Sequence, residues 1–221
     1  MSEPMKPMEI EQRSFEIITE LLRDRVLDPE NELVIKRVIH TTADFDYADN
    51  LTFSDHAVRK GIAALKSGCD IVTDTQMAKA GINKTILASL GGEVHCFMSD
   101  PDVAQEARSR GVTRAFVSME KAAALEKPCI FAIGNAPTAL LSLEQLMEEG
   151  KAAPALIIGV PVGFVNVVES KERLFAVCEK HDVPAIVAMG RKGGSNVAAA
   201  ICNALIYSAA EMLDPTARGW K

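Results

Sequence analysis

The sequence predicts an α/β fold with three layers, helix, sheet and helix, built around a mostly parallel sheet of about six strands, as in flavodoxin-like and Rossmann-like proteins. Two observations support this prediction. From residue 70 onward, short apolar runs alternate with helical stretches, and continuous apolar runs are typical of parallel strands buried on both faces. The first 68 residues have helical patterns only, so an N-terminal helical section is expected to precede the sheet.

Six β-like runs are predicted as strands, and most of them are continuously apolar. They are DIVTD (70–74), EVHCFM (93–98), TRAFVS (113–118), CIFAIG (129–134), ALIIGV (155–160) and PAIVAM (184–189). Helices are predicted between and after them, over residues 99–111, 138–149, 171–181 and 195–213. Strands that alternate with helices of this size favour right-handed β-α-β crossovers, with helices on both faces of the sheet.

Before the sheet, three helices are predicted, over residues 8–26, 30–41 and 54–67, with no strand among them. No linker rich in Pro, Gly or Ser separates these helices from the rest of the chain. We therefore expect the helical section (1–68) to pack on the α/β section (69–221) within one domain that spans residues 1–221.

Composition excludes several classes of protein. The 221 residues are 48% hydrophobic and 24% charged, which is ordinary for a globular protein and excludes a disordered or collagen-like chain. Lys plus Arg number 24 against 30 Asp plus Glu, and aromatic residues make up 5%. A nucleic-acid partner is therefore not expected, because such proteins usually show a basic excess and stacking aromatics.

The apolar stretches and the cysteines bear on the compartment. No apolar stretch approaches the roughly 20 residues of a membrane-spanning helix, and the polar N-terminus has no signal-peptide core. The five cysteines are odd in number and lack a CxxC spacing, which argues against a disulfide framework. We expect a cytoplasmic protein with no membrane partner.

Three glycine-containing loops are the best candidates for a ligand site. They span residues 133–138, 159–166 and 190–196, each directly after a predicted strand. Ligands of open parallel sheets bind at the carboxyl ends of strands. The third loop adds Arg191, Lys192 and a predicted helix N-terminus, which suit an anion. Tight strand-to-helix turns would also explain single glycines, but three such loops at one edge favour a ligand site.

Common nucleotide and metal motifs are missing from these loops. In GRKGGSN (190–196) the lysine precedes the glycine pair, so the loop is not a GxxxxGK[ST] motif, and no GxGxxG follows any strand. His95 and Cys96 are adjacent in a predicted strand and should face opposite sides of the sheet. No metal site is predicted.

His40 ends an apolar helix, and on this pattern alone a hydrogen-bonded helix-end histidine is the simpler interpretation.

The sequence resembles the precorrin-8 methylmutase family, and within it the cobalt-precorrin-8 branch of the anaerobic route to cobalamin. The resemblance covers nearly the whole chain. The matching segments are SFEII (14–18), IKRVIHTTADFD (35–46), TDTQMAKAGINK (73–84), GGEVHCFMSDP (91–101), GVTR (111–114), GNAPTAL (134–140), GVPVGFVNVVESK (159–171) and GRKGGSNVAAAICNAL (190–205).

This resemblance implies an isomerase without a cofactor that moves a methyl group from C-11 to C-12 of a corrinoid precursor and so gives a cobyrinate-type macrocycle. The shift is a [1,5]-sigmatropic migration, for which a proton donor to the ring suffices. The family's catalytic histidine falls on His40, and imidazole suits proton exchange near neutral pH. Ser14 and Arg114 match substrate-contacting positions of the family.

The implied substrate is a broad tetrapyrrole with apolar faces and a rim of carboxylates, so its site should have apolar walls and polar donors at the rim. Val162, Phe164 and Val165 are candidates for the walls. The candidate substrate-binding residues are Ser14, Arg114, Asn135, Thr138, Arg191, Lys192 and Ser195. The resemblance also implies a homodimer with sites at or near the interface.

Two other functions remain open at this stage. One is a protein that binds or channels a corrin intermediate without chemistry. The other is an α/β enzyme for a phosphorylated nucleotide, which the missing fingerprints disfavour. For Arg191 and Lys192, an exposed turn with solvated charges is the alternative to carboxylate binding.

Overall fold

The structure, a computed structural model, describes residues 6–214. Its helices are α1 (Pro7–Leu22), α2 (Glu32–Thr42), α3 (Tyr47–Asn50), α4 (Ala57–Lys66), α5 (Gln76–Gly81), α6 (Lys84–Ser89), α7 (Pro101–Arg110), α8 (Arg114–Ala123), α9 (Pro137–Glu148), α10 (Val167–Lys180) and α11 (Ser195–Ala209). Its strands are β1 (Leu51–Phe53), β2 (Asp70–Thr73), β3 (Val94–His95), β4 (Cys129–Ile133), β5 (Leu156–Gly159) and β6 (Ala185–Ala188). None of the described helices is both long and apolar enough to cross a membrane.

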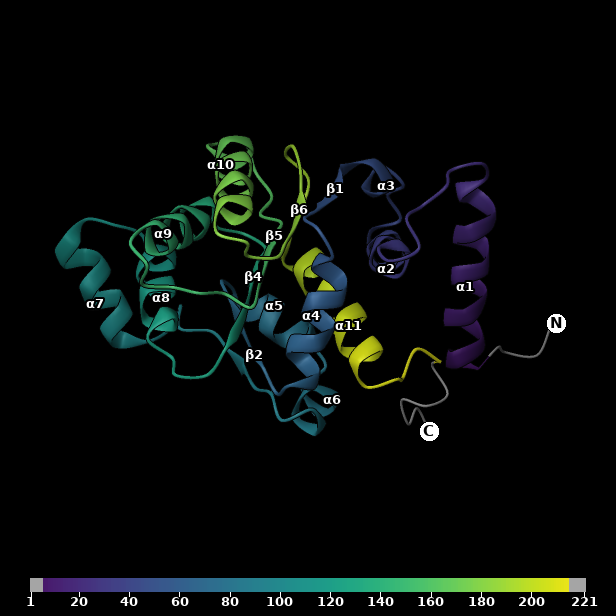
Figure 1. Cartoon of the computed structure of the whole chain (residues 1–221), viewed down its shortest axis with the longest axis horizontal. Coiled ribbons are helices and arrows are strands. Elements are labelled where there is room, and N and C mark those ends of the chain that lie inside the picture. The colour runs from purple at the N-terminus through teal and green to yellow at the C-terminus, as the bar shows by residue number, and fades with distance from the viewer. Residues whose placement is uncertain (1–5, 215–221) are drawn as a thin grey trace.

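The six strands form one sheet in the order β1-β6-β5-β4-β2-β3 (Figure 1). Four of the pairings are parallel, and β1 pairs antiparallel with β6. This confirms the predicted mostly parallel sheet. Without β1, the order is that of flavodoxin-like sheets, in which the first strand of the parallel set lies between the second and the third. The strand order therefore reverses between β2 and β4.

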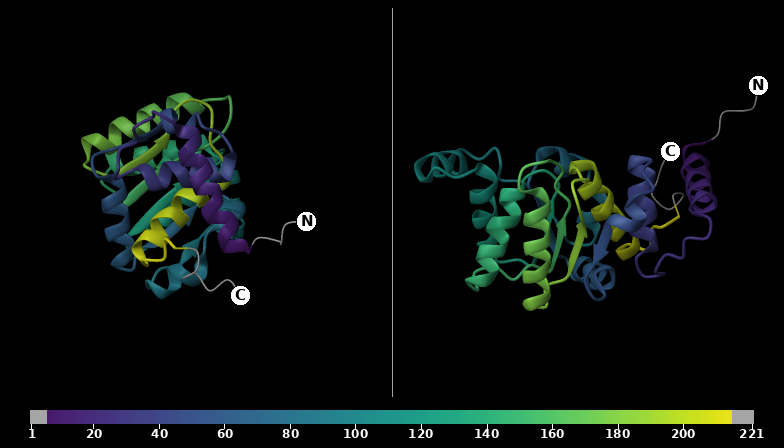
Figure 2. Two further views of the ribbon diagram at one scale, coloured as in Figure 1. Left: turned by 90° about the vertical axis from the view of Figure 1, so that its right-hand side faces the viewer. Right: turned by 90° about the horizontal axis from the view of Figure 1, so that it is seen from above.

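Helices cover both faces of the sheet, and the strand residues alternate between the two cores. In β4, Ile130 belongs to the core that includes α2, α4 and α11, whereas Phe131 belongs to the core that includes α8, α9 and α10. The side views in Figure 2 show these layers. Every residue of β2, β4, β5 and β6 is buried, and β4, β5 and β6 have the continuous apolar runs of a doubly covered sheet.

Helix α11 connects the helical section to the sheet. It packs against α2 and α4 as well as α5, and most of its residues are buried. Helix α1 packs on α2 and lies at one end of the longest axis of the molecule, whereas α7 and α8 lie toward the other end (Figures 1 and 2). The helical section therefore contacts the α/β section through α2 and α4, which pack on α11, and through β1, which pairs with β6.

Two secondary-structure predictions are wrong. Segment 113–118 is not a strand, because α8 begins at Arg114. The Thr113 side chain accepts a hydrogen bond from the Phe116 amide at 3.2 Å, which is an N-terminal helix cap. Ala115, Met119 and Ala122 are buried at helical spacing. Segment 93–98 also contains a shorter strand than predicted, only Val94–His95.

The prediction of three N-terminal helices without a strand is also wrong, because β1 lies between α2 and α4. Strand β1 has only three residues and pairs with β6 at the edge of the sheet. A run of three residues is too short to show an alternating pattern in the sequence. The short helices α5 and α6 were missed for the same reason, since each has six residues.

Candidate functional site

The loops after β2 and β4 meet where the strand order reverses, and a buried carboxylate joins them. Asp74 follows β2 directly and is fully buried. Its oxygens accept hydrogen bonds from the backbone amides of Gly134, Asn135 and Ala136 at 2.7–2.8 Å. Burial raises the pKa of Asp74, and the three amides oppose that rise. In open α/β sheets this crevice is where ligands bind.

The three glycine-containing loops predicted to share one edge do pack together. The Gly194 amide donates to the Val160 carbonyl at 2.9 Å, and the Val160 amide donates to the Ile133 carbonyl at 2.8 Å. A Cβ atom on Gly193 would lie 2.1 Å from the Val160 oxygen, and one on Gly134 would lie 2.7 Å from the Ser195 Cα. Glycine is required at both positions by this close backbone approach.

Two lysines fix the loop after β6 from different sides. Lys171 of α10 is fully buried, and its amine donates to the carbonyls of Gly190 and Lys192 at 2.9 and 2.8 Å. The Lys192 amine bonds to Asp44 and Asp46 at 2.6 Å each, and these carboxylates raise the pKa of Lys192. The loop is thereby tied to the turn that follows α2.

His40 lies in the last turn of α2 and stacks on Phe15 of α1, with ring centroids 5.3 Å apart and planes at 10°. The Arg37 guanidinium lies 4.7 Å from the centroid of the Phe15 ring and 5.4 Å from the centroid of the Tyr207 ring on α11. Arg37 also pairs with Glu11 at 2.7 Å. Three helices thus orient the imidazole through ring and cation–π contacts.

This environment favours the neutral form of His40. Desolvation lowers the pKa of His40 most, the charge of Arg37 lowers it further, and Glu11 opposes both. Neither ring nitrogen of His40 makes a hydrogen bond or ion pair with any residue in the described part of the chain. Both nitrogens of this exposed imidazole are therefore without a partner among residues 6–214.

The other predicted site residues lie on three parts of the fold. Ser14 precedes Phe15 on α1, and its hydroxyl donates to the Ile10 carbonyl at 2.8 Å. At the edge of the sheet where the loops after β4, β5 and β6 pack together (the loop edge), the Ser195 and Thr75 hydroxyls are 2.8 Å apart. The Thr138 hydroxyl accepts a hydrogen bond from Thr113 at 2.8 Å. The side chain of Asn135 is exposed.

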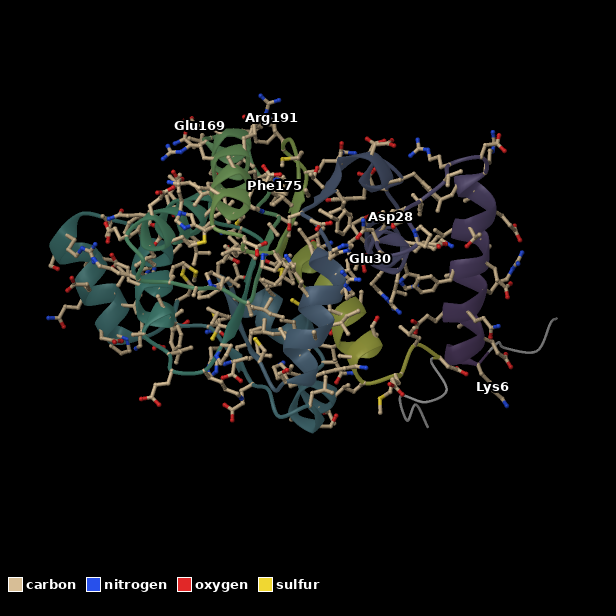
Figure 3. The ribbon with its side chains drawn as sticks, viewed as in Figure 1. Lys6, Asp28, Glu30, Glu169, Phe175 and Arg191 are labelled. Carbon is tan, nitrogen blue, oxygen red and sulfur yellow. The ribbon has the colours of Figure 1, made fainter. Side chains whose placement is uncertain are left out.

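Arg114 and Arg191 are exposed arginines with no carboxylate within ion-pair distance among residues 6–214. Figure 3 shows Arg191 at the surface, extended away from the ribbon. Arg114 borders a hollow of about 520 Å³ beside α7. Helices α1 and α8 lie toward opposite ends of the molecule (Figure 1), so one chain does not bring Ser14 and Arg114 together.

Sequence reasoning missed the residues that hold the site in place: Asp74, Lys171, Phe15 and Arg37. Two of them carry a signal that could have been used. Asp74 is a carboxylate directly after a buried strand, and Lys171 lies among Val167, Leu174 and Cys178 on the buried face of α10. A charge at a core-facing position predicts buried polar partners.

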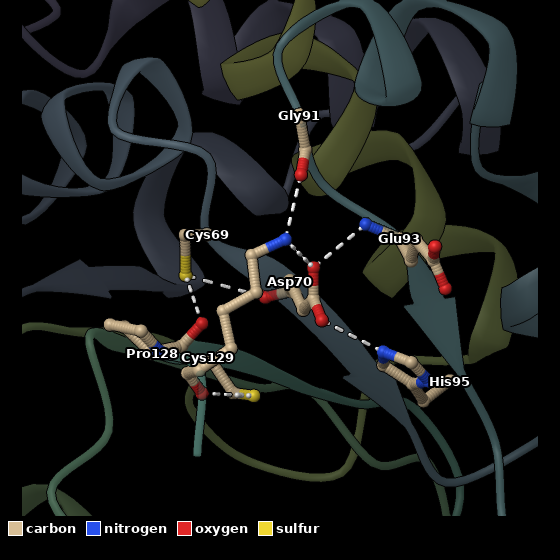
Figure 4. Close-up of polar contacts among 8 residues, drawn as sticks. Cys69, Asp70, Gly91, Glu93, His95, Pro128 and Cys129 are labelled. Atoms are coloured by element: carbon tan, nitrogen blue, oxygen red, sulfur yellow. Dashed lines mark hydrogen bonds and ion pairs between the residues drawn. The ribbon is translucent and has the colours of Figure 1, made fainter. Parts of the chain in front are cut away.

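A second polar cluster lies at the opposite, amino-terminal end of β2 (Figure 4). Asp70 bonds to His95 at 2.9 Å and to Lys127 at 2.7 Å, and it accepts from the Glu93 amide at 2.8 Å. Cys69 donates to the Pro128 carbonyl. These bonds join β2, β3 and β4. No three His, Cys, Asp or Glu side chains gather as a metal site within residues 6–214.

Comparisons with known proteins agree with this architecture. A family model described as precorrin-8X methylmutase matches residues 9–208. The chain is 49% identical over 208 residues to the cobalt-precorrin-8 methylmutase of Salmonella typhimurium, covering 91% of this chain and 95% of that protein. It is 46% identical over 201 residues to the protein of the same name from Priestia megaterium, covering 91% and 88%.

A solved structure has the same fold. The precorrin-8X methylmutase of Thermus thermophilus superposes with a TM-score of 0.81 at 39% identity, covering 91% of this chain and 98% of that one. The match therefore includes the helical section as well as the sheet. On the family model, the relatives and the fold, this chain belongs to the precorrin-8X methylmutase family.

Proposed function

We propose that this isomerase moves the methyl group at C-11 of cobalt-precorrin-8 to C-12, giving cobyrinate, and that His40 exchanges the proton that promotes the shift. Membership of a methylmutase family makes the chain an isomerase. The names of its relatives support the cobalt-containing substrate. The observation that carries the role of His40 is an oriented imidazole whose two nitrogens have no partner among the described residues.

In the reaction, the bond between the methyl carbon and C-11 breaks as the bond to C-12 forms, so no group leaves the macrocycle. Protonation of a ring nitrogen beside C-11 draws electrons toward that nitrogen, and His40 supplies this proton and takes it back afterwards. The carboxylates of the bound substrate lie near the imidazole and raise its pKa, because a nearby opposite charge favours the imidazolium.

Arg191 and Arg114 are the cations for the substrate carboxylates, because neither guanidinium is paired within residues 6–214. Lys192 has a different role, since two aspartates already engage its amine. The loop after β5 supplies apolar contact, because Phe164 is 87% exposed and Val165 is 78% exposed. Large apolar side chains at this exposure are typical of a binding surface.

We also propose that the enzyme is a homodimer whose site uses both subunits. The separation of Ser14 on α1 from Arg114 on α8 supports this, because a second copy could bring one to the other. Helix α1 exposes Ile10, Ile17 and Leu21 at helical spacing, an apolar stripe suited to a protein contact. Analytical ultracentrifugation should give twice the mass of the chain, and a monomer at micromolar concentration would contradict the dimer.

Two further parts of the proposal concern the chain as a whole. A single domain is supported by one core that contains both Val38 of α2 and Leu205 of α11. A reducing, cytoplasmic compartment is supported by the five cysteines, which are all buried thiols without disulfides.

The test of the function is turnover of purified protein with cobalt-precorrin-8, followed by visible absorption and mass spectrometry. Methyl migration changes the chromophore but not the mass. A new spectrum with unchanged mass supports the mutase. Binding without a new product would favour a corrinoid carrier instead.

A further inference from the structure

Lys171 is a buried cation without a buried anion. The side chain lies on the inner face of α10 and is fully buried, and no carboxylate of the described chain forms an ion pair with it. Lys127 at the other end of the sheet differs, since it pairs with Asp70 at 2.7 Å. Burial lowers the pKa of Lys171 to about 8. A lysine in the core costs free energy unless hydrogen bonds compensate.

The compensation comes from one short loop. The amine donates to the carbonyls of Gly190 and Lys192, at 2.9 and 2.8 Å. Both carbonyl oxygens must therefore face α10. Positive φ angles of 76° at Gly190 and 158° at Gly193 give the loop this path, and such angles favour glycine.

The orientation of these carbonyls fixes the orientation of the next two amides. The peptide bonds are trans, and in a planar trans peptide the C=O and the following N–H point in opposite directions. The N–H groups of Arg191 and Gly193 therefore face away from Lys171. Neither donates a hydrogen bond to any acceptor in residues 6–214.

In the neighbouring loop after β4, a buried side chain binds the backbone amides and not the carbonyls. Asp74 accepts the amides of residues 134–136, so that loop has no free donors at these positions. Backbone N–H groups of a glycine-rich turn bind anions well. At this edge, the loop held by Lys171 therefore offers two unpaired backbone donors, next to the exposed guanidinium of Arg191.

We propose that Lys171 is a positioning residue that turns the amides of Arg191 and Gly193 outward to receive a carboxylate of the macrocycle. The inference rests on the proposed function for the identity of the ligand. Lys171 does not touch the ligand, because it lies on the inner side of the loop. Its contribution is the direction of two peptide planes, so it acts on affinity for carboxylates and not on proton transfer by His40.

The experiment compares two forms of the product, cobyrinate and the same macrocycle with its carboxylates esterified, by equilibrium dialysis. Wild type should bind the carboxylate form more tightly. Lys171→Met should reduce that preference by about tenfold or more, because hydrogen bonds from two donors to a charged group are lost. Lys180→Met is the matched control, since Lys180 is exposed on the same helix and pairs with Glu148; it should keep the wild-type preference.

An unchanged preference in folded Lys171→Met, or no preference in wild type, would overturn the proposal. If Lys171→Met does not fold, Lys171→Gln retains one side-chain donor group and should show a smaller loss in the same direction. Amide NMR gives a readout without ligand. The Arg191 and Gly193 amide signals should shift in the Lys171 variant and stay fixed in Lys180→Met.

The NMR readout also separates the two proposals. If wild type binds neither form of the macrocycle, the proposed function fails. Unshifted amides in the Lys171 variant would instead show that Lys171 does not set the peptide planes, whatever the protein turns over.

Discussion

The helical section and the loop edge of the sheet hold their functional groups in different ways. In the helical section, His40 is oriented by side chains, through its stack on Phe15 and the nearby Arg37. At the loop edge, two buried charges bind the backbone. Asp74 accepts hydrogen bonds from amides of the loop after β4, and Lys171 donates hydrogen bonds to carbonyls of the loop after β6. Substitutions in the first region should therefore change the chemistry, and substitutions in the second should change binding and stability.

The largest expected effect separates chemistry from binding. His40→Ala should lower kcat by about 10²–10⁴-fold, the usual contribution of a general acid–base group, while the dissociation constant for cobyrinate changes little. Steady-state kinetics and dialysis measure the two quantities. His181→Ala, which removes a histidine near the end of α10, is the control. Full turnover by His40→Ala would show that His40 of the helical section has no role in the chemical step.

At the loop edge, Asp74→Asn should lower the free energy of unfolding by about 1–3 kcal/mol, because one amide group cannot accept all three backbone N–H bonds and its own NH₂ meets donors. Urea-induced unfolding measures the difference. Asp182→Asn is a suitable control, since Asp182 is exposed and already adopts a φ of 51°, which Asn tolerates. Equal stabilities of the two variants would show that Asp74 does not hold the loop.

The pH dependence of stability tests the second buried charge. Burial lowers the pKa of Lys171 from 10.5 to about 8, so between these values the unfolded chain binds more protons than the folded one. Stability then rises with pH in this window. Relative to Lys171→Met, the free energy of unfolding of wild type should rise by about 1–2 kcal/mol between pH 8 and pH 9.5. This size follows from a largest slope of about 1.4 kcal/mol per pH unit. A difference that does not vary with pH would place the amine in water.

The smallest expected effect refines the account of His40. Arg37→Met removes a cation that lowers the pKa of His40 and leaves Glu11, which raises it. Loss of this cation should therefore raise the pKa of His40. An NMR titration of the four histidines measures this, with His40→Ala identifying the signal. Arg13→Met on the exposed side of α1 should leave the titration unchanged. A fall in the His40 pKa would contradict the proposed contacts.

The sequence predicts the parts of this molecule that depend on local pattern. The apolar runs CIFAIG, ALIIGV and PAIVAM correspond to β4, β5 and β6, because strands buried on both faces need continuous apolar residues. The run TRAFVS also contains residues that favour strands, yet it is helical, because the cap at Thr113 and the packing of α8 outweigh the β propensity of Phe116 and Val117.

Contacts between distant elements could not be predicted in this way. His40 and Phe15 are 25 residues apart, and Lys171 reaches a loop 19 residues away; no spacing within one helix encodes either contact. The three glycine loops were expected at one edge because parallel strands carry their loops there. Asp74 binds the amides of one loop and Lys171 binds the carbonyls of another. These partners are known only from the folded chain.

The close approach of Gly193 to Val160, and of Gly134 to Ser195, has a consequence for engineering the enzyme. At these two contacts, the connections after β4, β5 and β6 meet main chain to main chain. A library that varies one connection alone would clash with its neighbours. Redesign for a wider or narrower macrocycle would have to exchange all three connections together, as a single cassette.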